Sequence, residues 1–232
     1  QHLEALRHSL RLGVRVIDTS PNYENGESEK LVGTAVREFM TQGSRDELTI
    51  VTKVGVLQGS DLEDAMERER LGRPWPGTLK LSSTAWYCIA PEAVLHAVRA
   101  SEQRLGTMPD AVLLHNPEFI LADMLARHGP SGIDRDRFYS AVGNALGALS
   151  TLSSDGDGRR SLRLGLSANV VGCRYSVSGR ANDLEAVELP RVLAAASEAG
   201  VDDASIGNLN LLQVPLNLLE PDAALGLRGG SP

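Results

Sequence analysis

The stretch VRVIDTSPNYENGESEKLVG, residues 14–33, contains the pattern that decides the fold. Its first five residues predict a short apolar strand that ends at Asp18. From Glu27 onward, apolar residues recur on one face of a predicted helix, and acidic residues occupy its first turn. The loop between strand and helix carries Tyr23. The same order of strand, loop and helix returns along the rest of the chain.

The remaining predicted elements alternate in type. A helix ends at Gly13, and further helices are predicted at 27–40, 91–106, 137–152 and 190–200; strands are predicted at 14–18, 47–53, 110–115, 162–167 and 209–215. Such alternation, with nearly continuous apolar strands, indicates a parallel sheet covered by helices. An open nucleotide-binding sheet would show G-x-G-x-x-G between its first strand and helix, and no strand-to-helix junction has it. We therefore predict an α/β fold of the (β/α)8 TIM-barrel type, as one domain over residues 1–232 with an enlarged irregular loop at 54–90.

The composition of the chain limits which kinds of molecule the protein is expected to bind. The 232 residues are 42% hydrophobic and 23% charged, with a formal charge of −7, which argues against a general binder of nucleic acid or acidic membranes. No apolar run approaches the roughly 18 residues that span a bilayer. The two cysteines, Cys88 and Cys173, lack metal-ligand spacing and predict reduced thiols in a cytoplasmic protein. A small-molecule ligand is expected, and no metal.

Polar residues end the five predicted strands. In a (β/α)8 barrel the chemistry is built at the carboxyl ends of the strands. Those ends carry Asp18 with Tyr23 in the following loop, then Lys53, His115, Ser167 followed by Asn169, and Gln213. Each residue alone has an ordinary structural explanation, such as a cap or a satisfied core histidine. Their arrival at one barrel face favours a functional site.

These residue types suit proton exchange with an oxygen. A phenol gives up its proton with difficulty at neutral pH, and an adjacent ammonium such as that of Lys53 stabilises the phenolate of Tyr23. Asp18 would hold the lysine charged, and His115 could donate a hydrogen bond to a substrate carbonyl. The set predicts interconversion of a carbonyl and an alcohol. Because none of these groups is redox active, a hydride cofactor is the economical source of electrons.

The motifs that carry these residues resemble those of the aldo-keto reductase superfamily. GVRVIDTSPNYENGESEKLVG, VTK and LLH are similar to its signature segments in the expected order. The resemblance implies a catalytic tetrad of Asp18, Tyr23, Lys53 and His115, with Tyr23 as general acid/base. LGLSAN and LLQVP resemble the segments that contact the nicotinamide carboxamide, which implies cofactor contacts from Ser167, Asn169 and Gln213. The family's adjacent Ser-Asn pair is here interrupted by Ala168.

The resemblance implies an NAD(P)(H)-dependent oxidoreductase of an aldehyde, ketone or sugar, and favours NADP(H) over NAD(H). It extends over the family's second to sixth strands, so the other strands and the segment that binds the adenosine phosphate are expected beyond the two ends. LLHNPEFIL resembles a poorly characterised branch with an enlarged segment before the third helix. In that segment Trp75, Trp86 and Tyr87 are candidates for pocket walls or for ordinary loop packing.

Two other functions remain open at this point. A non-catalytic relative could use the same barrel as a regulatory or binding subunit, which the interrupted Ser-Asn pair would suit and the intact tetrad would not. A metal-dependent barrel hydrolase would require His-x-His or clustered carboxylates at the strand ends, and neither pattern occurs.

Overall fold

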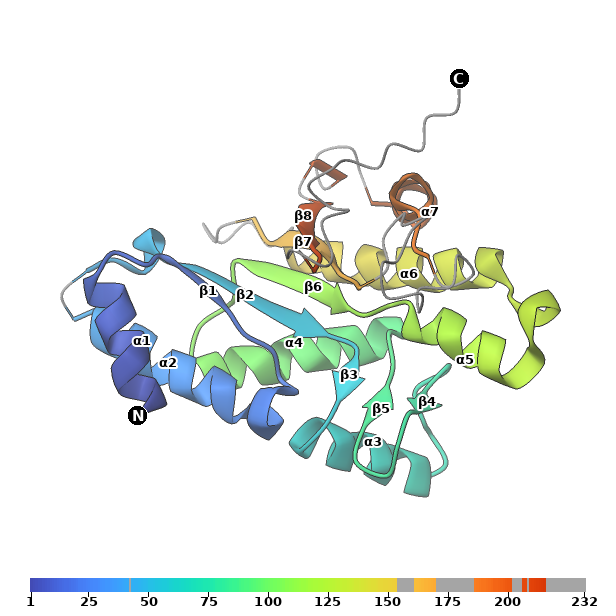
Figure 1. Ribbon diagram of the computed structural model, residues 1–232, viewed down its shortest axis with the longest axis horizontal. Helices are drawn as coiled ribbons and strands as arrows, with labels where there is room; N and C mark the ends of the chain where they lie inside the picture. The colour runs from blue at the N-terminus through green and yellow to red at the C-terminus, as the bar shows by residue number, and fades with distance from the viewer. Residues whose placement is uncertain (42, 154–160, 170–185, 202–205, 208, 216–232) are drawn as a thin grey trace.

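A parallel sheet forms the centre of the computed structural model, which describes residues 1–41, 43–153, 161–169, 186–201, 206–207 and 209–215. Within this part of the chain the strand order is β1-β2-β6-β7-β8 and every pair is parallel (Figure 1). The strands are β1 Val16–Asp18, β2 Thr49–Val54, β6 Ala111–His115, β7 Arg163–Ser167 and β8 Leu209–Gln213. The predicted parallel sheet in sequence order is therefore confirmed.

The large helices form one layer in which each packs on the next. They are α1 His2–Arg11, α2 Glu27–Phe39, α4 Pro91–Leu105, α6 Arg135–Ser150 and α7 Leu189–Glu198. α1 contacts α2, α2 contacts α4, α4 contacts α6, and α6 contacts α7. A parallel sheet with such successive helices is part of a (β/α)8 barrel.

Sequence signals explain where the helices begin and end. α4 starts with Pro91 at its first position, where a missing N–H costs nothing, and stops at Gly106, whose φ of 71° is left-handed. Gly33 allows α2 to approach α4 closely, because a Cβ there would lie 2.4 Å from the carbonyl oxygen of Leu105. Any side chain at Gly33 would therefore force the two helices apart.

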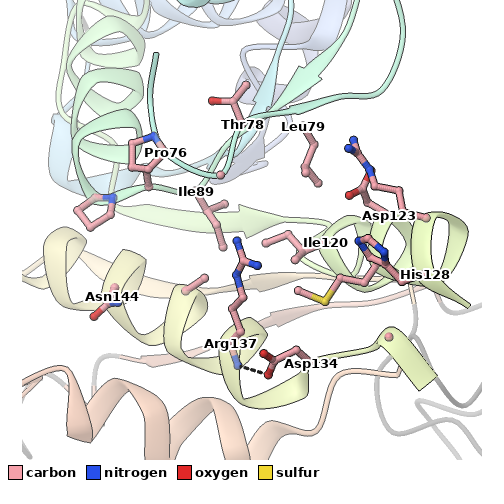
Figure 2. Close-up of a pocket in the computed structure, with 17 residues that line it drawn as sticks. Pro76, Thr78, Leu79, Ile89, Ile120, Asp123, His128, Asp134, Arg137 and Asn144 are labelled. Carbon is pink, nitrogen blue, oxygen red and sulfur yellow. Dashed lines mark hydrogen bonds and ion pairs between the residues drawn. The ribbon is translucent and has the colours of Figure 1, made fainter. Parts of the chain in front are cut away.

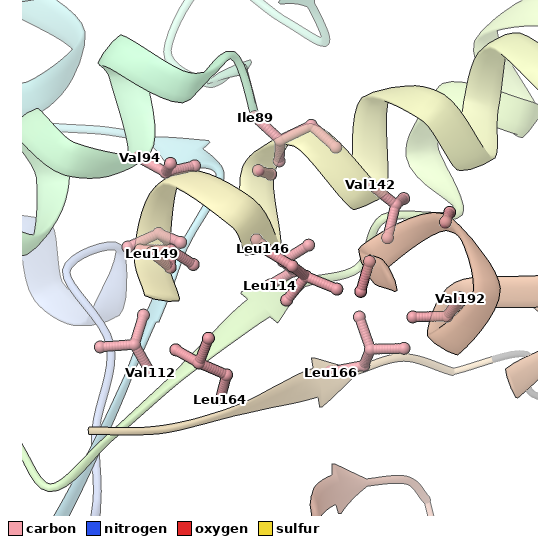
Figure 3. Packing of buried hydrophobic residues seen from close by; sticks show 14 of the residues in the cluster. Ile89, Val94, Val112, Leu114, Val142, Leu146, Leu149, Leu164, Leu166 and Val192 are labelled. Atoms are coloured by element: carbon pink, nitrogen blue, oxygen red, sulfur yellow. The ribbon is translucent and has the colours of Figure 1, made fainter. Parts of the chain in front are cut away.

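The main hydrophobic core lies between the sheet and the helices that cover it. Figure 3 shows apolar side chains of β6 and β7, including Leu114 and Leu166, facing those of α6 and α7, including Leu146 and Val192. All four are nearly or fully inaccessible to solvent. Burial of apolar surface on this scale fixes the strands, and with them the positions of the polar residues at their ends.

The segment 54–90 is structured, so the prediction of an irregular loop is wrong. It contains β3 Val56–Leu57, α3 Ser60–Arg70, β4 Leu79–Lys80 and β5 Trp86–Tyr87. The three strands form a separate antiparallel sheet in the order β3-β5-β4. Side chains of the segment form a small core with Ala93 of α4, built on Leu57, Leu62, Trp75, Trp86 and Cys88.

The aromatic residues of this segment are interior side chains. Trp75 and Trp86 are 4% and 7% exposed, and Tyr87 is fully buried with its ring 5.6 Å from that of Phe119. Of the two roles considered for these residues, packing is therefore the observed one. Cys88 is a buried free thiol, while Cys173 lies outside the described residues.

Further short elements join the barrel units. The helix α5 Phe119–His128 follows β6 and was not predicted; 3-10 turns are η1 Tyr23–Gly26, η2 Arg45–Glu47, η3 Pro130–Gly132 and η4 Thr151–Ser153. Across the described ranges, the helices are too short or too polar to cross a lipid bilayer.

Candidate active site

Lys53 is the centre of the polar cluster at the carboxyl ends of β1 and β2. Its side chain is 1% exposed, and its Nζ donates to both carboxylate oxygens of Asp18 at 2.9 and 2.8 Å. Nζ also donates to the backbone oxygen of Thr19 at 3.0 Å and lies 3.3 Å from the hydroxyl of Tyr23. A buried ammonium is costly unless it is paired and hydrogen-bonded, and these contacts meet both conditions. These contacts fix the Lys53 side chain beside the phenol.

The turn that carries Tyr23 has an unusual backbone. Glu24 and Asn25 have φ of 51° and 55°, and Gly26 has φ of 93°. Left-handed conformations cost energy for residues other than glycine, so the surrounding packing must impose this turn. The turn brings the Tyr23 ring over the lysine, with its centroid 5.0 Å from Nζ. Tyr23 remains 39% exposed, as a group that meets a substrate must be.

His115 ends β6 on the same side of the sheet. Its ring meets the ring of Tyr23 edge-on, with centroids 6.3 Å apart and an interplanar angle of 85°. Ser20 Oγ lies 3.4 Å from Nδ1. The next residue, Asn116, has φ of 50° and donates its backbone N–H to the carbonyl oxygen of Ser167 at 2.6 Å. The ends of β6 and β7 are thus joined.

The electrostatic surroundings keep His115 neutral. The pKa of His115 is lowered from 6.5 to about 4, chiefly by burial and also by the Lys53 ammonium, while the Asp18 carboxylate opposes the shift. At neutral pH the ring therefore has one N–H donor and one acceptor nitrogen. Such a ring can donate a hydrogen bond to a carbonyl oxygen without adding a second positive charge beside Lys53.

This shift predicts a pH dependence of stability. Between pH 6.5 and 4 the unfolded chain protonates this histidine and the folded protein does not, so the free energy of unfolding falls as pH falls through that window. Relative to His115→Asn, wild type should lose about 2–3 kcal/mol between pH 7 and 4. Urea unfolding at several pH values measures this difference. A difference independent of pH would contradict the assignment.

Ser167 and Gln213 extend the cluster along β7 and β8. Ser167 Oγ donates to Gln213 Oε1 at 2.8 Å, and Gln213 Nε2 donates to Asp18 Oδ2 at 3.2 Å. The two residues are also direct partners in the sheet register. Asn169 differs from these two, because its side chain is exposed and its backbone N–H donates to Glu118 Oε1 at 2.8 Å. The structure therefore joins six of the seven predicted site residues and leaves the Asn169 side chain apart.

A buried ion cluster beneath the Tyr23 turn was missed by the sequence analysis. Arg104 Nε donates to Glu29 at 2.6 Å, and its other nitrogens donate to Asp61 at 2.8 and 3.2 Å. Glu29 also accepts from the hydroxyl of Thr52, the residue before Lys53, at 2.5 Å. The cluster connects α2, α3, α4 and β2, the elements that surround the turn.

Arg104 also touches the turn itself. A Cβ at Gly26 would lie 3.0 Å from Arg104 Cδ, so the stem of the arginine fills the space under the last residue of the turn. On the other side, a Cβ at Gly59 would lie 2.8 Å from Cβ of Asn25. The turn is thus held between the arginine stem and the start of α3. The stem of Arg104 therefore packs against the turn that carries Tyr23.

Within the described ranges, His, Cys, Asp and Glu side chains form no group of three or more that could hold a metal ion. The cluster around Lys53 is instead built from one ammonium, one carboxylate, one phenol, one neutral imidazole, a hydroxyl and an amide. It is called the tetrad cluster below, and its members are Asp18, Tyr23, Lys53, His115, Ser167 and Gln213. This set can bind and polarise a carbonyl oxygen and can exchange a proton with it.

The chain belongs to the aldo/keto reductase family, whose model matches residues 1–160. It is 28% identical over 213 residues to a D-threo-aldose 1-dehydrogenase from Pseudomonas sp., covering 86% of this chain and 57% of that protein. It is 23% identical over 204 residues to the NADH-specific methylglyoxal reductase of Escherichia coli, covering 82% and 52%. The chain thus spans about half the length of these two relatives.

The fold is also similar to that of a solved structure, the glycerol dehydrogenase AKR11B4 from Gluconobacter oxydans. The TM-score is 0.52 at 19% identity, over 94% of this chain and 46% of that one. Together with the family match, this similarity identifies the sheet and its helices as part of the (β/α)8 barrel.

Proposed function

We propose that this protein is an NAD(P)(H)-dependent oxidoreductase that interconverts a small carbonyl compound and its alcohol. One observation carries the proposal: a buried, fully paired Lys53 ammonium lies 3.3 Å from the hydroxyl of Tyr23. An ammonium in this position can stabilise the negative charge that develops on the tyrosine oxygen as it gives its proton to a substrate. Packing alone does not require a buried lysine there.

In the reducing direction, Tyr23 donates its phenolic proton to the carbonyl oxygen as that oxygen gains negative charge. The Lys53 ammonium stabilises the phenolate that remains, and Asp18 keeps the ammonium fixed through both carboxylate oxygens. Neutral His115 donates a hydrogen bond to the same carbonyl oxygen and orients it. In the oxidising direction, the Tyr23 phenolate accepts the proton of the alcohol.

A nicotinamide cofactor would supply or accept the hydride. Ser167 and Gln213 are suited to hold its carboxamide, because a hydroxyl beside a side-chain amide offers both donors and acceptors. The family resemblance favours NADP(H), whereas one relative is named as NADH-specific. Binding titrations should therefore use both cofactors.

The names of three similar proteins support a small polar substrate. They are named for methylglyoxal, aldose and glycerol, which are small carbonyl or polyol compounds. A panel of small aldehydes, ketones and aldoses, followed by NAD(P)H fluorescence and absorbance, tests the proposal. Saturable cofactor binding with turnover of one or more members is expected. Absence of cofactor binding would contradict the proposal and would favour the non-catalytic alternative.

Replacing Gln213 with alanine should weaken cofactor binding about tenfold, because one or two side-chain hydrogen bonds are lost. The fluorescence titration of NAD(P)H measures the change. Asn210→Ala, on the same strand, is the matched control: Asn210 is exposed and donates only locally, to the carbonyl oxygen of Gly207 at 2.9 Å. Equal affinities for wild type and Gln213→Ala would remove Gln213 from the proposed cofactor site.

A further inference from the structure

A cavity of about 650 Å³ lies outside the tetrad cluster. It is enclosed by the segment 76–79, by the residues 89–91 that lead into α4, and by α5 and α6 (Figure 2). Asp18, Tyr23, Lys53 and His115 do not line it. Its volume is within the range of small-molecule sites.

The guanidinium of Arg137 extends from α6 into this cavity, toward Ile89 and Ile120 (Figure 2). Among the described residues, no carboxylate forms an ion pair with it, whereas the neighbouring Arg135 and Asp136 on α6 are paired with Glu188 and Arg191. Arg137 is therefore the charged residue of this helical turn whose guanidinium has no carboxylate partner among the described residues.

The acidic residues of the cavity are already engaged. Asp123 pairs with Arg127 at 2.8 Å, one turn along α5. Asp134 caps α6 by accepting the backbone N–H of Arg137 at 2.9 Å. His128 lies on the same wall as Asp123 (Figure 2) and offers a ring nitrogen to a ligand. The Arg137 guanidinium and the His128 ring are thus polar groups of the cavity that remain to bind an anion.

Apolar side chains also line the cavity: Ile120 and Met124 from α5, Ala141 from α6, and Leu79 and Ile89 from the segments before α4. A fully hydrated inorganic anion would gain nothing from these side chains. An anion with a hydrocarbon body would bury apolar surface there while its charge meets Arg137.

We propose that this cavity binds an amphipathic monocarboxylate, an aliphatic or aromatic carboxylic acid. Its carboxylate accepts from the Arg137 guanidinium, and its hydrocarbon body lies against Ile89 and Ile120. A planar guanidinium forms two parallel hydrogen bonds with a carboxylate, which fixes the head of the ligand. This site is separate from the proposed catalytic site and does not depend on the protein's activity.

Isothermal titration with octanoate tests the proposal. Wild type should bind octanoate saturably at one site, and Arg137→Gln should weaken that binding at least about tenfold, because a charge-assisted hydrogen bond is lost. Octanol, which lacks the carboxylate, should bind both proteins alike. Arg99→Gln is the matched control, because Arg99 is an exposed arginine on α4 that does not line the cavity.

Two more variants locate the site. Ala141→Phe should obstruct the cavity and weaken binding of both octanoate and octanol, whereas Tyr23→Phe should leave octanoate binding unchanged. No saturable octanoate binding by wild type, or equal affinity in Arg137→Gln, would overturn the proposal. Loss of binding in Tyr23→Phe would also overturn it, because the carboxylate would then occupy the tetrad cluster.

Discussion

Tyr23→Phe should lower the turnover of an accepted aldehyde by about 10²–10⁴-fold, the usual contribution of a positioned general acid. The phenyl ring can keep its place above Lys53 Nζ and beside His115, since both contacts involve the ring. Only the proton and the oxygen are lost. Binding of NAD(P)H should therefore stay nearly unchanged, and the loss should appear in kcat.

Tyr139→Phe is the matched control for this variant. Its hydroxyl accepts the backbone N–H of Glu188 at 2.9 Å, between α6 and the start of α7, and takes no part in the tetrad cluster. Removing that hydrogen bond should cost stability of about 1 kcal/mol and leave turnover unchanged. Turnover by Tyr23→Phe equal to that of wild type would remove the tyrosine from the proposed chemistry.

Arg104→Met should give the largest loss of stability, about 3–5 kcal/mol of the free energy of unfolding. The Arg104 side chain is 10% exposed, and its partners Glu29 and Asp61 are 0% and 5% exposed. Methionine retains much of the stem that lies under Gly26 but leaves two buried carboxylates without their cation. The carboxylates must then be protonated or reach water, and either change costs free energy in the folded state.

Urea unfolding of Arg104→Met and of Arg70→Met measures this effect. Arg70 also forms an arginine–carboxylate pair, with Glu67, but the two side chains are 69% and 53% exposed. Solvent and salt screen such a pair, so Arg70→Met should change the unfolding free energy by less than about 1 kcal/mol. Equal losses in the two variants would show that burial of the ion cluster contributes no stability.

The central sheet could be predicted from the sequence because its three inner strands, β2, β6 and β7, are buried on both faces. AVLLH in β6 and RLGLS in β7 are nearly continuous apolar runs that end in a polar residue. The rule that barrel strands point their carboxyl ends to one side then brought Lys53 and His115 together. The contact of Gln213 with Asp18, across 195 residues, follows from the same rule.

The segment 54–90 could not be predicted in this way. Its strands β3, β4 and β5 have two residues each, too few to show an alternating pattern. α3, with the sequence SDLEDAMERER, is mostly charged, and Leu62 and Ala65 are its buried apolar residues. The helix forms because those two side chains pack on Trp75 and Trp86, a tertiary contact with no local signature.

The ion cluster under the Tyr23 turn escaped prediction for a related reason. Arg104 lies on an ordinary amphipathic helix, and its acidic partners are 43 and 75 residues away. Charged residues at such separations show no spacing that distinguishes a buried pair from two solvated groups. Only the packing of α2, α3 and α4 brings them together.

The most direct test of the proposed function follows the hydride itself. The protein is incubated with an accepted aldehyde and NAD(P)D that carries deuterium at both C4 positions of the nicotinamide ring, and the alcohol is analysed by mass spectrometry. Hydride transfer beside Tyr23 and Lys53 predicts one deuterium on the carbinol carbon with wild type and almost no labelled alcohol with Tyr23→Phe. Unlabelled alcohol, or no alcohol from any member of the substrate panel with wild type, would contradict the account.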